Sequence, residues 1–380
     1  MDKAETLHVV EPTLQDETGH CLSFLESVFL ARDRPFPVVF WVGRKARLRH
    51  FVASGASVRP YFHRRFRKLQ AFLLYRALLA GTGRLFLPTA GRTDLILLHW
   101  AARKPIPPGK VILYFHWLRS SPERLRSLAR LARKQPQLTV LGPTETVAKI
   151  LRDSGFADAR MAPYPLTPHP FPRAVPFTHV LYAGAARQDK GIAAVVDFVA
   201  RLAASGSNLP VIVQTSPDHQ HRYDSKTADD LARLERIGYP RLTIRPETLS
   251  KEDYAALYAG AVCLQPYRRQ DFSDRVSGIT LDALSLGAPV ITTAGTWMGR
   301  LVERYGAGLT VKDFSPASLQ VAVETVRKQY DVYASRACEG GAALRVEHSG
   351  QHLMDIFTEK PGSSPASAGG RRGLAAHPPG

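Results

Sequence analysis

The sequence has few cysteines and no long apolar run. Three cysteines occur among 380 residues, and Cys21, Cys263 and Cys338 are far apart. This number and spacing exclude a disulfide framework and a paired-cysteine metal site. No apolar run approaches the ~20 residues needed to span a bilayer. The first residues do not combine a basic segment with an apolar one, so we expect no signal peptide. A cytoplasmic location is therefore expected.

Acidic residues are scarce relative to basic ones. The chain has 33 Asp and Glu against 51 Lys and Arg, a formal net charge of +18. Residues 1–170 carry 27 basic and 12 acidic side chains, whereas the remaining residues carry 24 and 21. An electropositive first half indicates an anionic partner, which would be nucleic acid, an anionic membrane surface or a phosphorylated substrate. No zinc finger, basic helix-turn-helix or RNA-binding aromatic pair accompanies these cations, so no nucleic acid is expected.

Short apolar runs alternate with helical patterns along both halves of the chain. This alternation is typical of parallel sheets covered by helices on both faces. The sequence therefore predicts an α/β protein with two Rossmann-like, doubly wound parallel-sheet domains. The predicted strands are residues 7–10, 38–42, 95–99, 111–116, 138–141, 180–183, 211–214, 242–244, 261–265 and 290–293.

A proline-rich stretch separates the two halves. Residues 163–176 contain six prolines, which excludes a helix or a central strand and indicates a linker. The predicted organisation is an N-terminal acceptor domain (residues 1–162), the linker (163–176) and a donor domain (177–340). A C-terminal helix (341–359) follows, for which a return to the first domain is left open, and then a disordered tail (360–380).

The first candidate site is a small-residue turn between a predicted strand and a helix in HVLYAGAARQDKGIAAVVDF. Gly184 and the two alanines after it allow backbone amides to approach a ligand closely. Arg187 and Lys190 place two cations beside the turn, and a helix N-terminus follows. Together these features suit a diphosphate. The alternative is an ordinary turn with solvated cations, and no GxGxxG pattern is present.

The second candidate site is a pair of carboxylates around a predicted helix start. Asp274 and Asp282 have seven residues between them. The amides of Ser277, Gly278 and Ile279 would begin a helix there and are suited to bind an anion. Asp282 would accept hydrogen bonds from ribose hydroxyls, and Asp274 from sugar hydroxyls. The alternative is that Asp274 flanks the helix as a cap and Asp282 is a solvated helix residue.

The pairing of GAARQDKG with DRVSGITLDALSLGAPVITT resembles the donor domain of GT-B glycosyltransferases, specifically glycosyltransferase family 4. The resemblance covers residues 176–340 well and the first domain weakly. Asp274 and Asp282 stand where the family usually has Glu, and Lys190 falls on the family's lysine. Arg187 lies two residues after the family's commonest arginine position, which holds Ala185.

The resemblance implies a GT-B fold, with two domains facing a cleft, and transfer from a nucleotide-diphosphate sugar with retention of configuration. This transfer would require no cofactor and no metal, because Arg187 and Lys190 would neutralise the leaving diphosphate. The implied products are surface polysaccharide, lipopolysaccharide or lipid-linked glycans. Two alternatives stay open: a nucleic-acid binding protein that uses the basic first half, and a GT-B sugar-nucleotide epimerase.

Histidines and a glycine turn are the candidates in the first domain. Gly19 and His20 lie in a loop that resembles the family's first strand-to-helix turn. His116 ends a predicted strand, where the family has a histidine that contacts the donor sugar. The alternative is that His116 is a core histidine hydrogen-bonded to the backbone. His99, at a similar predicted strand end, is a second candidate for the same role. The HxH pair of residues 219 and 221 has no third ligand, so no metal site is expected.

A basic segment over residues 59–86 interleaves cations with large apolar side chains. Five cations occur between residues 64 and 76. Such a segment is typical of a helix lying on an anionic membrane, and Arg64, Arg65, Arg67 and Lys68 are the predicted membrane contacts. The alternative is a helix packed on the first sheet with a solvated basic face. Peripheral attachment to the inner face of the cell membrane is thus one of two expectations.

Overall fold

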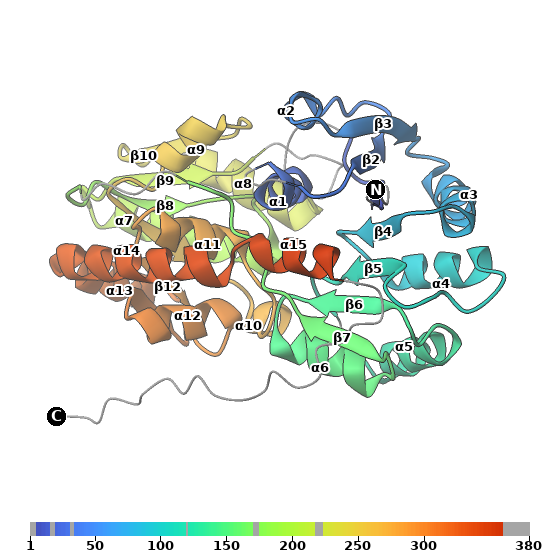
Figure 1. Cartoon of the computed structure of the whole chain (residues 1–380). Coiled ribbons are helices and arrows are strands. Elements are labelled where there is room, and N and C mark those ends of the chain that lie inside the picture. Colours follow the sequence, from blue (N-terminus) through green and yellow to red (C-terminus); the bar gives the residue numbers. More distant parts are fainter. Residues whose placement is uncertain are drawn as a thin grey trace.

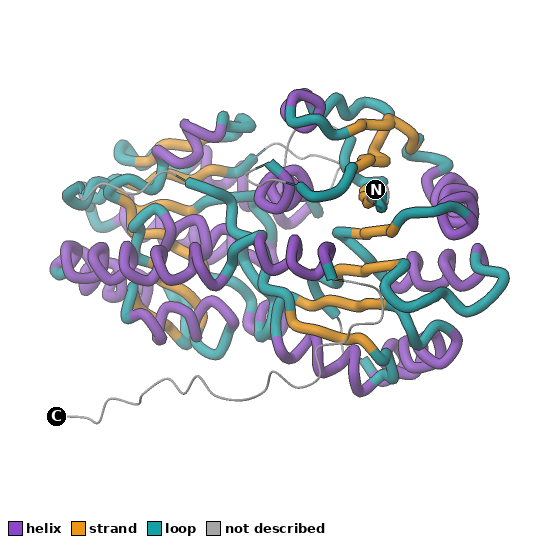
Figure 2. Tube along the Cα trace, in the orientation of Figure 1, coloured by secondary structure: helices purple, strands orange, loops and turns teal. Residues whose placement is uncertain are grey.

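The structure is a computed structural model of the chain. It describes residues 5–15, 20–30, 34–118, 121–169, 175–216 and 223–359. Gly19, both histidines of the HxH pair and the predicted tail lie outside these ranges, and of His20 only the backbone is described. Along the described chain, helices and strands alternate almost without interruption (Figure 2).

The first domain is built on a seven-stranded sheet in which every strand pairs in parallel. The strand order is β3-β2-β1-β4-β5-β6-β7. Because all strands run the same way, their carboxyl ends meet at one edge of the sheet. The strands are β1 (Leu7–Glu11), β2 (Val38–Gly43), β3 (Ser57–Phe62), β4 (Arg84–Leu87), β5 (Val111–Tyr114), β6 (Thr139–Gly142) and β7 (Asp158–Met161).

Helices cover both faces of this sheet (Figure 1). On one face α1 and α2 pack into a core with the strands. On the other face α3, α4, α5 and α6 form a second core. The helices are α1 (His20–Phe29), α2 (Arg49–Ala53), α3 (Arg67–Ala80), α4 (Arg92–Ala101), α5 (Pro122–Lys134) and α6 (Glu145–Asp153).

The second domain repeats the arrangement on a six-stranded parallel sheet of order β10-β9-β8-β11-β12-β13. Its strands are β8 (His179–Tyr182), β9 (Val211–Gln214), β10 (Leu242–Arg245), β11 (Ala261–Gln265), β12 (Val290–Thr293) and β13 (Gly308–Val311). Its helices are η1 (Gln188–Lys190), α7 (Ile192–Ala204), α8 (Ser225–Arg236), α9 (Lys251–Ala256), α10 (Arg269–Phe272), α11 (Gly278–Ser285), α12 (Trp297–Tyr305), α13 (Pro316–Lys328) and α14 (Tyr330–Glu347). The predicted class, two doubly wound parallel sheets, is confirmed.

The last helix crosses back to the first domain. Helix α15 (Gln351–Thr358) continues beyond α14 and lies beside the N-terminal sheet (Figure 1). Phe357 enters the same core as α1, where its ring lies 5.8 Å from that of Phe29 and 4.7 Å from that of Phe86. The guanidinium of Arg84 donates to the carbonyl oxygen of Phe357 at 2.6 Å. The C-terminal segment is therefore part of the N-terminal core.

One predicted strand is wrong. Residues 95–99 form part of α4, so His99 lies on a helix and not at a strand end. The amide of Gly91 donates to the carboxylate of Asp94 at 2.9 Å, which caps the start of this helix. The strand before this helix is β4, which begins within the segment predicted as basic and amphipathic. Strands β3, β7 and β13 were also not predicted from the sequence.

No helix among the described residues has the length and apolar character needed to cross a bilayer.

Candidate active site

The small-residue turn after β8 faces the start of α11. Gly184 has φ +96°, and its amide donates to Gln214 Oε1 at 2.7 Å. A Cβ added at Gly184 would lie 3.2 Å from Ile279 Cδ1 and 3.3 Å from Lys190 Nζ. The positive φ and this close approach both require glycine. The fold thus brings Gly184 and Lys190 of the first candidate site together with Ile279 of the second.

Lys190 points its ammonium group into this turn. The group lies 5.5 Å from the centre of the Tyr267 ring. Burial, followed by the neighbouring charge of Arg187, lowers the pKa of Lys190 to about 8. Gly191 follows with φ +73°, and a Cβ there would lie 2.0 Å from the carbonyl oxygen of Pro266. Only glycine fits at this bend. The bend directly follows Lys190, so its tight packing against Pro266 sets the position of the Lys190 backbone.

Arg187 is held by an acid that sequence reasoning missed. Its Nε and Nη2 donate to the two carboxylate oxygens of Asp189 at 2.8 and 2.6 Å. Nη1 of Arg275 lies 3.7 Å from the same carboxylate. The turn therefore gathers three cations, Arg187, Lys190 and Arg275, around one acid. Such a cluster is suited to bind a diphosphate.

The start of α11 is open to a ligand. Ser277 precedes the helix, and its Oγ accepts the amide of Thr280 at 3.4 Å. A Cβ added at Gly278 would meet no atom within 4 Å, so space remains over the first turn. The free amides of a first helical turn, together with the helix dipole, favour an anion there.

Asp274 joins the two domains. Its Oδ2 accepts a hydrogen bond of 2.6 Å from Thr144 Oγ1, which precedes α6 in the first domain. Its Oδ1 accepts from Arg300 Nη2 at 3.1 Å. A second polar link joins Lys251 of the second domain to both carboxylate oxygens of Glu26 in α1, each at 2.7 Å. Asp274 therefore lies where the domains meet.

Asp282 belongs to a largely buried polar network. His169 Nε2 lies 3.0 Å from its Oδ1, and Tyr254 donates to its Oδ2 at 3.0 Å. The hydroxyl of Tyr258 lies 2.6 Å from that of Tyr254. The Asp282 side chain is 14% exposed, so it is neither a solvated helix residue nor fully enclosed. A carboxylate has about four acceptor positions, so acceptor capacity remains beyond these two contacts.

The two candidate histidines lie in different settings. His116 follows β5 at the carboxyl edge of the first sheet, and its Nε2 lies 2.7 Å from the carbonyl oxygen of Pro88. The rings of Phe24, Tyr114 and Tyr164 pack around it. His99 lies on α4, away from any strand end. His116 thus has the partners of a core histidine and the position of a site histidine.

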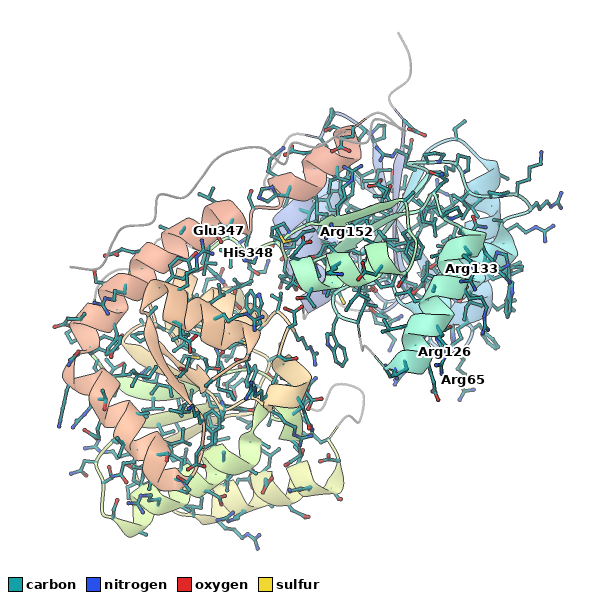
Figure 3. The ribbon with its side chains drawn as sticks, turned by 90° about the horizontal axis from the view of Figure 1, so that it is seen from below. Arg65, Arg126, Arg133, Arg152, Glu347 and His348 are labelled. Atoms are coloured by element: carbon teal, nitrogen blue, oxygen red, sulfur yellow. The ribbon has the colours of Figure 1, made fainter. Side chains whose placement is uncertain are left out.

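The predicted membrane contacts precede and begin α3. Arg64, Arg65, Arg67 and Lys68 are all exposed. Helix α3 packs on the sheet through Ala71, Leu74 and Tyr75. Three apolar side chains are exposed here, which are Phe66 directly before the helix (60% exposed) and Leu69 (59%) and Leu73 (49%) on it. Figure 3 shows further cations on the first domain, among them Arg126 and Arg133 of α5.

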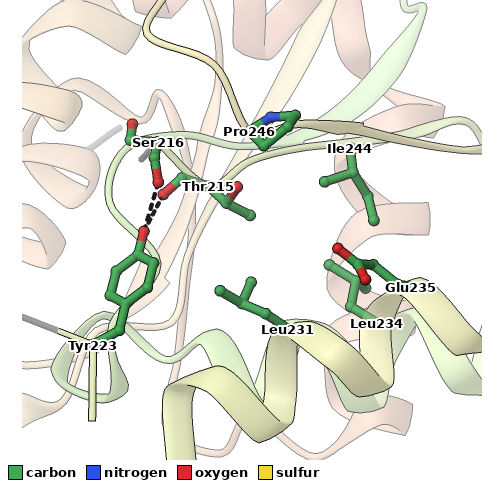
Figure 4. Close-up of a pocket in the computed structure, with 8 residues that line it drawn as sticks. All are labelled: Thr215, Ser216, Tyr223, Leu231, Leu234, Glu235, Ile244 and Pro246. Atoms are coloured by element: carbon green, nitrogen blue, oxygen red, sulfur yellow. Dashed lines mark hydrogen bonds between the residues drawn. The ribbon is translucent and has the colours of Figure 1, made fainter. Parts of the chain in front are cut away.

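A separate pocket lies between α8 and the ends of β9 and β10 (Figure 4). Its volume is about 220 Å³, and Leu231, Leu234 and Ile244 form much of its wall. The hydroxyl of Tyr223 lies 2.5 and 2.7 Å from the carbonyl oxygens of Thr215 and Ser216. None of the predicted site residues lines it, so this pocket is distinct from the turn after β8.

No group of three His, Cys, Asp or Glu side chains suited to a metal ion occurs among the described residues.

Comparison with known proteins finds similarity in structure alone. No family model matches the sequence, and no curated protein matches it. Sucrose-phosphate synthase from Thermosynechococcus elongatus superposes with a TM-score of 0.69 at 14% identity, covering 93% of this chain and 98% of that one. Anabaena HepE in complex with UDP-glucose superposes with a TM-score of 0.66 at 13% identity, covering 93% of this chain and 98% of that one. WaaG, a glycosyltransferase involved in lipopolysaccharide biosynthesis, superposes with a TM-score of 0.64 at 12% identity, covering 93% of this chain and 100% of that one.

The chain has the GT-B glycosyltransferase fold. In this GT-B chain, the predicted site residues of the second domain lie around the turn after β8 and the start of α11. Sequence reasoning missed Asp189 and Arg275, although both lie inside the quoted motifs. A signal for Asp189 was present, since an acid two residues after Arg187 and one before Lys190 is placed to pair with either cation. No local signal connects Arg275 with Trp117, which faces it from the other GT-B domain.

Proposed function

We propose that the chain is a glycosyltransferase that moves a sugar from a nucleotide-diphosphate sugar to an acceptor. The observation that carries this proposal is the set of three cations at the turn after β8, opposite the open start of α11. When the glycosidic bond to the donor breaks, negative charge develops on the leaving diphosphate. Arg187 and Lys190 would stabilise that charge, which is the main electrostatic task of such a transfer.

The other site residues have proposed roles in the same transfer. Gly184 and the amides of Ser277, Gly278 and Ile279 would contact the phosphates. Asp274 would hold hydroxyls of the donor sugar and Asp282 those of the ribose. His116 would contact the sugar from the first domain. As in the family that the sequence resembles, the transfer would retain configuration, with products in surface polysaccharide, lipopolysaccharide or lipid-linked glycans. A loop containing Gly19 and His20 would face the acceptor.

The test of this function is a panel of nucleotides. UDP, GDP, ADP and TDP, and their sugar conjugates, are added in thermal unfolding measurements. At least one should raise the unfolding temperature, because a ligand that binds the native state stabilises it. Release of nucleoside diphosphate that needs an added acceptor supports transfer. Sugar interconversion without an acceptor would identify an epimerase, and tight, steeply salt-dependent binding to random DNA alone would identify a nucleic-acid binding protein.

Asp282→Asn is expected to weaken the binding of nucleoside mono- and diphosphates alike. The amide nitrogen cannot accept the hydrogen bonds that a carboxylate accepts from ribose hydroxyls. The loss of such charge-assisted bonds corresponds to a fall of about tenfold or more in affinity. Isothermal titration calorimetry measures it. Tyr254→Phe, which removes one hydrogen bond to Asp282 but keeps the carboxylate, should leave the affinity close to that of the parent. Unchanged affinity of Asp282→Asn for every nucleotide that the parent binds contradicts the ribose role.

We further propose that the protein attaches to the inner face of the cell membrane through α3 and the turn before it. Exposed Phe66 and Leu69 alternate with exposed Arg65, Arg67 and Lys68. Exposed apolar groups among cations are suited to a bilayer with anionic headgroups, where each cation near the surface contributes about 1 kcal/mol. The site then faces a lipid-linked acceptor, which is itself anionic.

Vesicle co-sedimentation tests the membrane proposal. The parent should sediment with phosphatidylcholine–phosphatidylglycerol vesicles at low salt and not with phosphatidylcholine alone. Binding should be lost near 1 M salt, where the screening length falls to about 3 Å. The variant with glutamate at residues 64, 65, 67 and 68 should stay in the supernatant.

The matched control makes the same change of charge on the second domain. It carries glutamate at four exposed cations there, which are Lys226, Arg236, Lys312 and Lys328. This variant should still sediment, because its α3 surface is intact. A parent that remains in the supernatant with anionic vesicles at low salt overturns the membrane proposal.

A further inference from the structure

Arg275 contacts aromatic rings from both domains. Its guanidinium carbon is 4.9 Å from the ring centre of Phe272 and 5.2 Å from that of Trp117. Phe272 ends α10 in the second domain, whereas Trp117 follows β5 at the carboxyl edge of the first sheet. A planar guanidinium stacks on aromatic faces and keeps its N–H groups free at the edge. The two rings thus restrict where the Arg275 side chain can lie.

The charge around Arg275 is unbalanced. Asp189 contacts both Arg187 and Arg275, and Lys190 lies close enough for both cations to lower its pKa. Asp271 also acts on Arg275 but pairs with a further cation, Arg268, so the cations outnumber the acids at this partly buried position. Like charges that are withdrawn from water repel one another unless an anion compensates them. A group with two or more negative charges, such as a diphosphate, would restore the balance.

The position of Arg275 in the chain indicates which phosphate it would contact. It directly follows Asp274, the proposed sugar-binding residue, and precedes the start of α11. Asp282, the proposed ribose-binding residue, lies about one helical turn beyond that start. With these roles, Arg275 would lie on the sugar side of a bound donor. The phosphate on that side is the one that carries the sugar.

We propose that Arg275 is a third phosphate-binding residue, which contacts the terminal phosphate of a nucleoside diphosphate, and that Trp117 positions it from the opposite domain. This inference rests on the proposed donor function. Arginine suits the role because its fork of N–H donors matches two phosphate oxygens at once. The Trp117 contact makes the first domain part of the donor site.

The test compares diphosphates with monophosphates. UDP, GDP, ADP and TDP, each with its monophosphate, are titrated calorimetrically into the parent, Arg275→Gln and Arg275→Lys. Arg275→Gln should lower the affinity for the diphosphate by about tenfold or more, as expected for a lost charged hydrogen bond. The affinity for the monophosphate should stay unchanged. The diphosphate affinity of Arg275→Lys should lie between those of the parent and Arg275→Gln, because lysine keeps the charge and loses the planar fork of donors.

Two further variants test the positioning role and the specificity of the effect. Trp117→Leu should reduce the diphosphate affinity selectively, and Trp117→Phe should restore it. Arg268→Gln is the matched control, since Arg268 is a neighbouring cation that pairs with Asp271 at 3.5 Å. It should leave both affinities at the parental value.

Equal diphosphate affinity in the parent and Arg275→Gln overturns the role of Arg275 and leaves the donor function intact. An equal loss for mono- and diphosphates also overturns it, because the effect would then not come from the terminal phosphate. A parent that binds no nucleoside diphosphate at all removes the donor function, and this inference with it.

Discussion

We expect Lys190→Ala and Arg187→Ala each to lower turnover by roughly 10²-fold or more, the scale for the loss of one preorganised electrostatic stabiliser. The Lys190 ammonium points into the turn after β8, and Asp189 orients the Arg187 guanidinium beside it. Both charges would act on the leaving diphosphate, whose negative charge grows as the bond to the sugar breaks. Steady-state kinetics with the nucleotide sugar identified in the panel measure the effect.

Lys190→Met separates chemistry from folding. It keeps most of the side-chain length and removes a cation whose charged form burial disfavours, so its unfolding temperature should not fall below that of the parent. Its turnover should nevertheless fall as far as that of Lys190→Ala. Near-parental kinetics in folded Lys190 and Arg187 variants would show that this turn does not bind the donor diphosphate.

The lowered pKa of Lys190 adds a dependence on pH. In the free protein the pKa is about 8, so Lys190 loses its proton as the pH rises through that value. Only the protonated form attracts the diphosphate, so affinity should fall by about tenfold per pH unit above pH 8. Lys190→Arg keeps its charge over this range, so its affinity should not decline. The comparison needs only nucleotide titrations at several pH values.

We expect Phe357→Ala to lower the free energy of unfolding by about 3–5 kcal/mol, the usual cost of truncating a buried phenylalanine. Phe357 is 4% exposed and packs against Phe29 and Phe86 in the core of the first domain. The large-to-small change leaves a cavity where α15 meets this core. Urea unfolding followed by circular dichroism measures the change.

Val346→Ala is the control for Phe357→Ala. Val346 lies near the end of α14 and is 74% exposed. Its truncation removes apolar atoms that are already in water, so the change in stability should stay within about 0.5 kcal/mol. If Phe357→Ala and the parent unfold at the same urea concentration, α15 does not stabilise the first domain.

The sequence predicted the fold class because the apolar runs of a covered parallel sheet are short and bounded by turn residues. The run Leu95–Leu98 misled this reading, since a continuous apolar stretch has no period that separates a buried strand from a buried helix. The contact of the Asp94 side chain with the Gly91 amide stabilises the start of the helix, and this contact is visible only in the folded structure. Four-residue β4 begins with Arg84, a charged residue that a strand pattern does not favour.

For the site, the sequence predicted residues of the second domain that are close to one another in the chain. Gly184 and Lys190 flank one turn, and the carboxylates flank one helix start. The contacts across domains could not be predicted. Thr144 and Asp274 are 130 residues apart, and Trp117 reaches Arg275 from the other sheet. Pairs at such separations leave no mark on local periodicity or motif spacing, so only the folded chain reveals them.

The crossing of α15 also bears on how the chain is made. Synthesis on the ribosome proceeds from the N-terminus, and domains generally fold as they emerge. Here the first domain has emerged long before residues 351–358, yet those residues supply Leu353, Met354, Ile356 and Phe357 to its core. The nascent first domain therefore carries an uncovered apolar surface throughout synthesis of the second. Its core closes only after residues 351–358 have emerged.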